Sequence, residues 1–146
     1  MIDHISDRNK YILFQNKNSW DAIADDWFGA TALPSYGIYI PDENQIHLLG
    51  NLKNKKILDI GCGSGHSLLW CAEQGADTLW GVDLSSKQVS NATKLLHSSG
   101  YNATLVNSPM EENKGILVGY FDIVYSIYAI GWTTAVSYTH LTLPTT

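Results

Sequence analysis

The stretch ILDIGCGSG, residues 57–65, decides the fold. It joins a short aliphatic run to three glycines at alternate positions, Gly61, Gly63 and Gly65. A short apolar run that ends at a glycine is typical of a strand buried on both faces of a sheet. Glycines in the turn behind it clear away side chains and let a ligand come close to the backbone. The stretch therefore predicts a buried strand followed by a ligand-binding loop.

The segments after this loop alternate between helix and strand patterns. An apolar stripe at helical spacing runs through residues 66–75, and a second, introduced by Ser85 and Gln88 as a capping box, ends before Gly100. The expected strands cover residues 55–60, 78–84, 103–107 and 120–129. This alternation favours right-handed crossovers and a parallel sheet with helices on both faces. The predicted fold class is therefore α/β.

Residues 1–50 form a separate amino-terminal helical and lid segment. Apolar residues at helical spacing predict an amphipathic helix over 18–28 with Ser19 as its N-cap. Prolines and a glycine make 33–43 a loop, and an apolar run predicts a short helix over 45–52. We expect this segment to lie against the sheet domain.

The carboxyl-terminal residues 136–146 differ in composition from the rest of the chain. They are free of charge and rich in threonine, and VSYTHLTLPT resembles one reading frame of a sequencing-library adapter. We therefore expect 136–146 to be a non-native tail. The Rossmann-like half-domain is then expected over 51–135, and the natural chain is expected to continue past Thr134 as a longer protein.

Composition and charge limit the kinds of binding partner that the chain can be expected to have. The chain has 146 residues, 45% of them hydrophobic and 16% charged, with a net charge of −5. These values favour a soluble globular domain. No cluster of lysine and arginine provides a surface for phosphates, so a nucleic-acid partner is not expected.

The cysteines, the histidines and the amino terminus point to a cytoplasmic protein without a metal. Neither Cys62 and Cys71 nor the histidines have zinc or triad spacing, and His66 is expected at a helix start or on the surface. The amino terminus lacks the pattern of an export signal, and the apolar stretch 116–132 is interrupted by glycines and Asp122, so no membrane span is expected.

The spacing of the glycine loop limits its ligand. A phosphate-binding P-loop needs a lysine and a serine or threonine after its last glycine, whereas His66 and Ser67 follow Gly65. A dinucleotide loop has the spacing GxGxxG, and the third glycine here comes one residue early. The spacing therefore excludes a nucleoside triphosphate and counts against NAD.

Two carboxylates further define the chemical class of the expected ligand. Asp59 precedes the loop, where a buried negative charge repels a pyrophosphate and attracts an ammonium or sulfonium group. Asp83 ends the second expected strand, a position from which a carboxylate accepts both ribose hydroxyls. The expected ligand is a cationic nucleoside without phosphates, and S-adenosylmethionine has these properties.

Three motifs in this order carry a resemblance to a known family. ILDIGCGSG, GVDLS at 81–85 and FDIVYS at 121–126 resemble the opening motifs of class I S-adenosylmethionine-dependent methyltransferases, and SWDAIADDW at 19–27 is similar to the aromatic-Asp helix of many small-molecule members. The resemblance implies a Rossmann-like doubly wound sheet, here truncated after about four strands in the order 3-2-1-4. It implies a cofactor site made of Asp59, Gly61, Cys62, Gly63, Gly65, Asp83, Leu84, Met110 and Ser126.

The resemblance also implies roles. Asp59 faces the methionine ammonium of the cofactor, Asp83 binds the ribose hydroxyls, and Leu84 packs on adenine. Many members carry an acidic residue after the third strand that accepts from the adenine amino group, but Pro109 stands there in this chain. The Met110 N–H is then retained, and the carboxylate contact is lost or passes to Glu111.

The expected function is transfer of the methyl group to a small molecule by in-line displacement, for which no catalytic base is identified. Ser126, Tyr128 and Trp132 lie at the expected acceptor edge, and Trp20 and Trp27 could close over the cofactor or simply pack in the core. Two alternatives stay open: an NAD-dependent Rossmann oxidoreductase, and an inactive fragment that binds the cofactor without transferring a methyl group.

Overall fold

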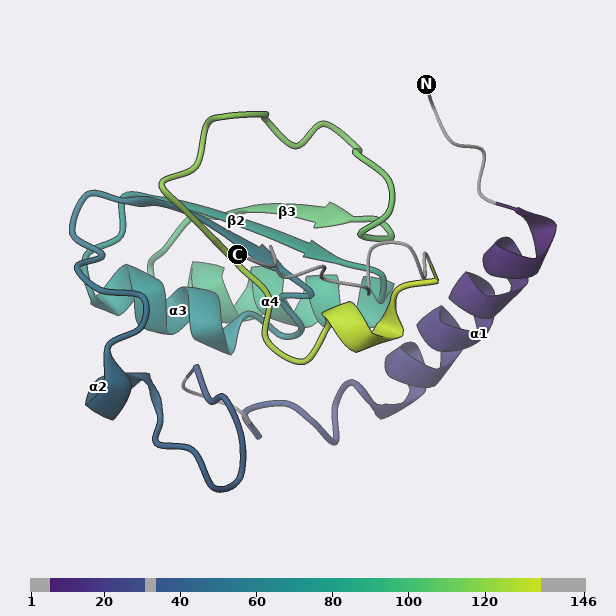
Figure 1. Cartoon of the computed structure of the whole chain (residues 1–146), viewed down its shortest axis with the longest axis horizontal. Helices are drawn as coiled ribbons and strands as arrows, with labels where there is room; N and C mark the ends of the chain where they lie inside the picture. Colours follow the sequence, from purple (N-terminus) through teal and green to yellow (C-terminus); the bar gives the residue numbers. More distant parts are fainter. Residues whose placement is uncertain (1–5, 31–33, 135–146) are drawn as a thin grey trace, which may run out of the picture.

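The computed structural model of the chain describes residues 6–30 and 34–134, and within them a parallel sheet of four strands forms the centre (Figure 1). The strands, in chain order, are β1 (Lys56–Ile60), β2 (Thr78–Asp83), β3 (Thr104–Asn107) and β4 (Ile123–Tyr125). Their order across the sheet is β3-β2-β1-β4. The predicted α/β class and the strand order 3-2-1-4 are thus confirmed. The expected tail, 136–146, lies outside the described residues.

The register of the sheet determines which side chains meet at its carboxyl edge. Asp59 near the end of β1 pairs with Gly81 of β2 on one side and with Tyr125 of β4 on the other. On the next strand, Asp83 pairs with Asn107. Because all strands run parallel, the loops that follow them meet at one edge.

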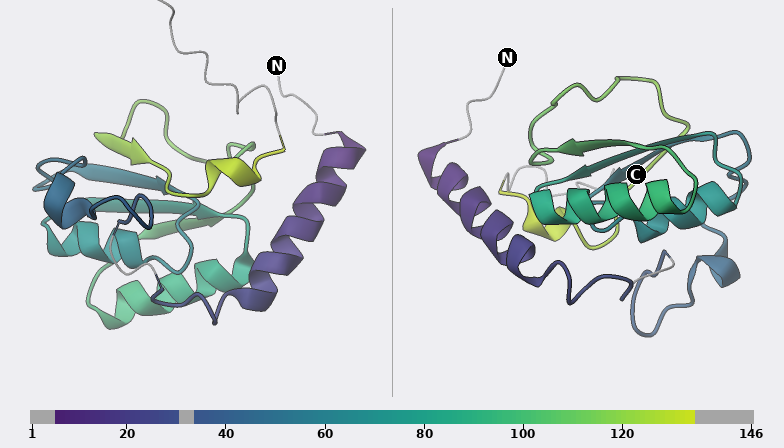
Figure 2. Two further views of the ribbon diagram at one scale, coloured as in Figure 1. Left: turned by 60° about the horizontal axis from the view of Figure 1, so that its bottom comes forward. Right: turned by 180° about the vertical axis from the view of Figure 1, so that it is seen from behind.

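Two helices cover one face of the sheet. α3 (His66–Glu73) follows β1 and α4 (Ser86–Ser98) follows β2, and Figures 1 and 2 show them side by side on that face. The sheet moves outward in one direction from β1 to β3, so both right-handed crossovers place their helices on the same face. Helices are predicted on both faces of the sheet, but the described residues 108–122 between β3 and β4 form turns and bends, so this crossover adds no helix to the opposite face. The buried core under α3 and α4 consists of Leu52, Ile57, Cys62, Leu68, Trp70, Cys71, Ala72, Leu79 and Leu96.

The start of α4 differs from the expected capping box. The Ser85 hydroxyl accepts from the Gln88 amide at 3.1 Å, as a capping serine does. The Gln88 side chain, however, accepts from the Ser64 hydroxyl of the glycine loop, and the Ser85 amide donates to Asp83 at 2.9 Å. The residue that would close the box instead ties α4 to the loop.

The amino-terminal helix begins earlier and ends earlier than predicted. α1 covers Asp7–Ile23, and the Ser6 hydroxyl caps it by accepting from the Asn9 amide at 3.2 Å. The predicted cap, Ser19, lies inside this helix, because no glycine or proline interrupts it between Asp7 and Ile23. Residues 24–30 form turns instead of continuing the helix.

The second amino-terminal helix is also shorter than predicted. α2 covers Glu43–Ile46, not 45–52, and ends at His47, which has a left-handed backbone with φ of 54°. The buried Glu43 carboxylate causes this turn because it accepts from the amides of Leu48 and Leu49 at 3.0 and 2.6 Å. These amides therefore bond to a side chain instead of continuing the helix.

The fourth strand was predicted over 120–129 and is limited to Ile123–Tyr125. It pairs with β1 alone, and the chain turns away directly after it. The Ser126 hydroxyl donates to the Ile60 carbonyl at 2.8 Å, and Tyr128 adopts a left-handed φ of 63°. Aromatic and β-branched residues continue beyond Tyr125, so composition alone overestimates the strand.

A carboxylate of α1 fastens that helix to the start of α4. Asp21 accepts from the Ser85 hydroxyl at 2.5 Å and from the Lys87 amide at 3.1 Å, and it pairs with Lys17. Asp25 accepts from Asn91 at 3.0 Å. Partial burial alone would raise the pKa of Asp21, but these hydrogen bonds and Lys17 lower it to about 2. The negative charge of Asp21 at the N-terminus of α4 also interacts favourably with the helix dipole.

Within residues 6–30 and 34–134, no helix combines the length and the apolar character needed to cross a membrane.

We expect Asp21→Asn to lower the free energy of unfolding at pH 7 by about 1 kcal/mol, the usual contribution of a helix cap. The folded pKa lies below the ordinary value of 3.8, so the ionised carboxylate stabilises the fold above about pH 4. This stability is lost as the pH falls toward 2, and the variant should show a flatter decline over that range. Urea unfolding followed by circular dichroism at pH 2.5, 4 and 7 measures this. Asp26→Asn, at an exposed neighbour, is the control, and equal losses in both variants would contradict the prediction.

Candidate cofactor and acceptor site

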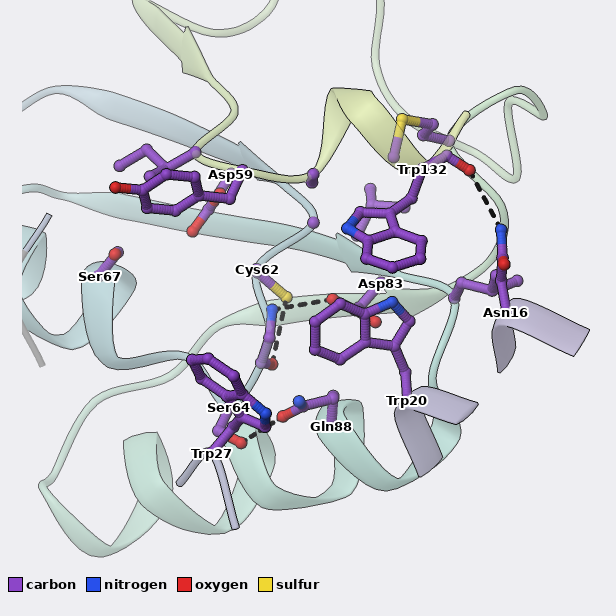
Figure 3. A pocket seen from close by; sticks show the side chains of 18 of the residues that line it. Asn16, Trp20, Trp27, Asp59, Cys62, Ser64, Ser67, Asp83, Gln88 and Trp132 are labelled. Atoms are coloured by element: carbon purple, nitrogen blue, oxygen red, sulfur yellow. Dashed lines mark hydrogen bonds between the residues drawn. The ribbon is translucent and has the colours of Figure 1, made fainter. Parts of the chain in front are cut away.

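A cavity of about 550 Å³ lies at the carboxyl edge of the sheet (Figure 3). Its walls come from the glycine loop, the ends of β1 and β2, the turns after β3 and β4, and the inner side of α1. Small-molecule sites range from roughly 300 to 1,000 Å³. The cavity is therefore of a size that holds a nucleoside cofactor.

Seven of the nine residues predicted for the cofactor site line this cavity. They are Asp59, Gly61, Cys62, Gly63, Asp83, Leu84 and Met110. The other two, Gly65 and Ser126, do not line it. The aromatic residues Trp20, Trp27, Tyr128 and Trp132 also line it, so the structure brings together chain segments that the sequence separates by about a hundred positions.

The glycine loop needs its glycines for two different reasons. Gly61 has a φ of 80°, and a Cβ there would lie 2.0 Å from the Cβ of Ala129 in the turn after β4. Gly63 has a φ of 53°, and a Cβ there would meet no atom within 4 Å, because the loop faces open space. Gly61 thus permits a close contact between chain segments, whereas Gly63 leaves room beside the cavity.

Gly65 and Ser126 have structural contacts instead of cavity contacts. A Cβ on Gly65 would lie 2.9 Å from the Cβ of Ala92, so this glycine lets α3 start close against α4. The Ser126 hydroxyl is directed to the Ile60 carbonyl, as described above. Sequence spacing could not separate these roles from ligand contact, because a glycine that permits helix packing has the same signature.

Asp83 is oriented by backbone amides on both sides. Its two carboxylate oxygens accept from the amides of Gly63 and Ser85, each at 2.9 Å. Burial raises the pKa of Asp83, and these hydrogen bonds oppose the rise. Each oxygen keeps further acceptor capacity, so the carboxylate can take two more hydrogen bonds from a ligand.

Asp59 is a buried carboxylate with no basic partner among the described residues. It is 3% exposed, and burial raises its pKa to about 7, opposed by a hydrogen bond from Tyr125 and aided by the charge of Asp83. Among the described residues, no lysine or arginine lines the cavity. A cationic ligand would therefore supply the positive charge that this carboxylate lacks.

Two tryptophans close one side of the cavity. The rings of Trp20 on α1 and Trp132 in the 3-10 turn Ile130–Trp132 meet edge to face at 5.3 Å between centroids, and Figure 3 shows them facing one another. The Asn16 side chain donates to the Trp132 carbonyl at 3.3 Å. Both contacts join α1 to the turn that follows β4.

The turn after β3 places Pro109, Met110 and Glu111 in the cavity wall. One oxygen of Glu111, Oε1, accepts from the Thr133 hydroxyl at 2.8 Å and from the Thr134 amide at 2.7 Å. This carboxylate therefore links the turns after β3 and β4. Its other oxygen, Oε2, accepts no hydrogen bond from the described residues.

His66 begins α3, as expected, and it also lines the cavity, which sequence reasoning missed. Its ring packs edge to face on Phe28 at 4.7 Å between centroids. Burial lowers the pKa of His66, so the imidazole is neutral at physiological pH. Ser64 and Gln88 were missed as well, because their hydrogen bond joins residues 24 positions apart.

Comparison with known proteins identifies the class of this domain. A family model described as a methyltransferase domain matches residues 57–141, more than half of the chain. A solved S-adenosylmethionine-dependent methyltransferase from Mesorhizobium loti is 26% identical, with 63% of this chain and 41% of that chain covered and a TM-score of 0.52. The fold and the glycine loop are those of class I S-adenosylmethionine-dependent methyltransferases. The chain belongs to the methyltransferase-domain family, and the family match decides against the NAD alternative.

Three relatives show the range of the family. An uncharacterized protein of Haemophilus influenzae is 37% identical over 93 residues, which are 62% of this chain and 37% of the relative. A tRNA U34 carboxymethyltransferase of Saccharophagus degradans is 37% identical over 54% of this chain and 25% of the relative. A ubiquinone biosynthesis O-methyltransferase of Bordetella avium is 35% identical over 53% of this chain and 32% of the relative. The matched part spans less than half of each relative's length.

We expect Asp59→Asn to raise the free energy of unfolding at pH 8.5 and to change it little below pH 4. The folded pKa of about 7 lies above the ordinary value of 3.8, so the carboxylate destabilises the fold increasingly as the pH rises from about 4 to 7. Removing the charge should gain on the order of a few kcal/mol at high pH. Urea unfolding at pH 3.5 and 8.5 measures the difference, with Asp26→Asn as the control. A gain of the same size at both pH values would contradict this account of Asp59.

Proposed function

We propose that this protein transfers a methyl group from S-adenosylmethionine to a small molecule that carries no negative charge. The observation that supports this most directly is the joint placement of the glycine loop, Asp59 and Asp83 around one cavity that is walled by tryptophans. The sulfonium of the cofactor supplies an activated methyl group and a neutral leaving group. The protein's own part is to orient both reactants and to exclude water.

The residues of the cavity fit the cofactor. Asp59, buried and with no basic partner among the described residues, matches the methionine ammonium, and the two free acceptor positions of Asp83 match the ribose hydroxyls. Gly63 leaves open space beside them. Leu84 and Met110 provide the apolar and backbone contacts expected for adenine.

Glu111 supports one of the two possibilities left for adenine recognition. Glu111 lines the cavity, and Oε1 of its carboxylate accepts from Thr133 and Thr134, whereas Oε2 accepts no hydrogen bond from the described residues. We propose that Oε2 accepts from the adenine amino group, in place of the acidic residue that Pro109 replaces.

The charge and the aromatic lining of the cavity point to the acceptor. Three carboxylates and the neutral His66 line it, and no lysine or arginine among the described residues does. A phosphate or carboxylate on the acceptor would meet negatively charged side chains and no cationic one. Trp20, Trp27 and Trp132 instead provide flat apolar surfaces for a neutral or cationic molecule.

The names of the relatives leave this choice open. One acts, by its name, in ubiquinone biosynthesis and another on tRNA. The lack of basic residues in the described cavity wall and the net charge of −5 favour the small molecule over RNA.

We expect S-adenosylhomocysteine to bind, and Asp83→Asn to weaken its binding at least tenfold. Hydrogen bonds to a charged group contribute about 1.5–3 kcal/mol, which corresponds to a loss of roughly 10- to 100-fold. Calorimetric titration measures the dissociation constants. Asp77→Asn, at the exposed opposite end of the β2 region, is the matched control and should bind normally.

The same titration tests the competing identities. NADH should give no binding heat. Binding of NADH without S-adenosylhomocysteine, or no binding of S-adenosylhomocysteine by the unaltered chain, would overturn the proposed function. Binding with no methyl transfer to any acceptor would instead favour the alternative of an inactive fragment.

A screen of acceptors that share a scaffold and differ in charge tests the acceptor class. We expect S-adenosylhomocysteine release with neutral or amine-bearing aromatic molecules, and at least tenfold less with the same scaffolds bearing a carboxylate or phosphate. The release is measured by coupled enzymatic detection. Turnover confined to anionic scaffolds or to tRNA would overturn the assignment of the acceptor and leave that of the cofactor intact.

A further inference from the structure

The Asp59 carboxylate has one polar side chain beside it in the sheet. Its register neighbour on β2 is Gly81, which has no side chain, and the space over that glycine is filled by Cys62, whose Sγ would lie 2.7 Å from a Cβ there. Its neighbour on β4 is Tyr125, on the same face of the sheet. The tyrosine is therefore the neighbour that can hold Asp59 from within the sheet.

The Tyr125 hydroxyl lies between two buried groups. It donates to the Asp59 carboxylate, and its oxygen lies 3.7 Å from the Sγ of Cys71 on α3, a residue with no exposed surface. Tyr125 does not line the cavity, whereas Asp59 does. The hydroxyl thus contacts the carboxylate from the side away from the ligand.

The direction of this hydrogen-bonded chain follows from its acceptor, because an ionised carboxylate can only accept. The single Tyr125 hydroxyl proton then points to Asp59, and the Cys71 thiol, which can be donor or acceptor in its contact with Tyr125, is the donor there. Burial raises the pKa of Tyr125 well above its ordinary value and that of Cys71 to about 12, so both groups keep their protons. The acceptor at the end of the chain is the carboxylate that faces the cavity.

The remaining groups around Asp59 do not stabilise its charge. Asp83 on β2 repels it, and burial raises the pKa of Cys62 in the loop, which stays a neutral thiol. The negative charge of Glu43 on α2, like that of Asp59, raises the pKa of Cys71. The hydrogen bond from Tyr125 is the one contribution that favours the ionised carboxylate.

We propose that Tyr125 is a positioning residue for the cofactor, whose hydroxyl orients the Asp59 carboxylate toward the cofactor's ammonium group. This inference rests on the proposed function, in which Asp59 faces that ammonium. Tyr125 touches no ligand and acts through Asp59. Removing its hydroxyl therefore changes the pH at which the site becomes able to bind, without removing any cavity contact.

The test is the dissociation constant of S-adenosylhomocysteine as a function of pH from 5.5 to 9, measured by calorimetry. In the unaltered protein we expect affinity to fall below about pH 7, because the protonated Asp59 no longer attracts an ammonium group. In Tyr125→Phe the midpoint should move up by about 1 pH unit, the lower end of the size expected for one lost hydrogen bond to a charged group. Affinity at pH 6.5 should then drop at least fivefold and recover at pH 9.

Tyr101→Phe is the matched control, since Tyr101 is half-buried against the same core and its hydroxyl makes no recorded hydrogen bond to the described residues. A 3-fluorotyrosine at position 125 keeps the shape and donates more strongly, so it should move the midpoint to lower pH. This second substitution decides the question if Tyr125→Phe does not fold.

The outcomes separate the two proposals. No binding by the unaltered protein at any pH would overturn the proposed function. Binding by the unaltered protein with an unchanged midpoint in Tyr125→Phe, or in the fluorotyrosine protein, would overturn the role of Tyr125 alone. An equal loss of affinity at every pH would also overturn it, because that is the signature of a general packing defect.

Discussion

The parallel pairing of β1 with β2 on one side and β4 on the other is the constraint on which the rest of the structure depends. It sets Asp59 between Gly81 and Tyr125 and brings the ends of three strands to one edge. The loop after β1 then lies against the end of β2, and the amides of Gly61 and Cys62 donate to the Val82 carbonyl at 2.7 and 3.0 Å. The floor of the cavity follows from this arrangement, since the glycine loop and the turn after β4 begin where β1 and β4 stop.

The carboxylates of the site make an unfavourable electrostatic contribution to the stability of the fold. Asp59 is a buried carboxylate and Asp83 a partly buried one near it, with no basic side chain among the described cavity residues to balance them. Buried charges of one sign are unfavourable until a ligand of the opposite sign arrives. Such a site is therefore less stable when empty than an apolar core of the same shape, and the difference becomes available as binding energy for a cation.

Local patterns predicted the centre of the fold well. The bounds of β1, β2, β3, α3 and α4 lie within two or three residues of the expected ranges, because glycines and a capping serine mark their ends. The loop glycines and the two aspartates were found by spacing. These are signals between neighbours in sequence, and neighbouring residues are what a sequence shows directly.

The errors lie where distant contacts decide. Glu43 ends α2 because its carboxylate accepts hydrogen bonds from two amides that would otherwise continue the helix. Similarly, β4 stops where the Ser126 hydroxyl donates to the Ile60 carbonyl. Gly65 has the same signature as its two neighbours but packs against Ala92. The wall formed by Trp20 and Trp132 joins residues 112 positions apart, and no local pattern contains that information.

The attachment of α1 has a consequence for access to the cavity. This helix buries one of its own residues, Leu13, and is otherwise held by Asp21, Asp25 and their partners on α4 and by the contacts with Trp132. The exposed ion pair between Lys87 of α4 and Asp25, just after α1, weakens as ions screen it, whereas the backbone hydrogen bonds of the sheet behind it are unaffected. The entrance to the site is thus sensitive to ionic strength in a way that its floor is not.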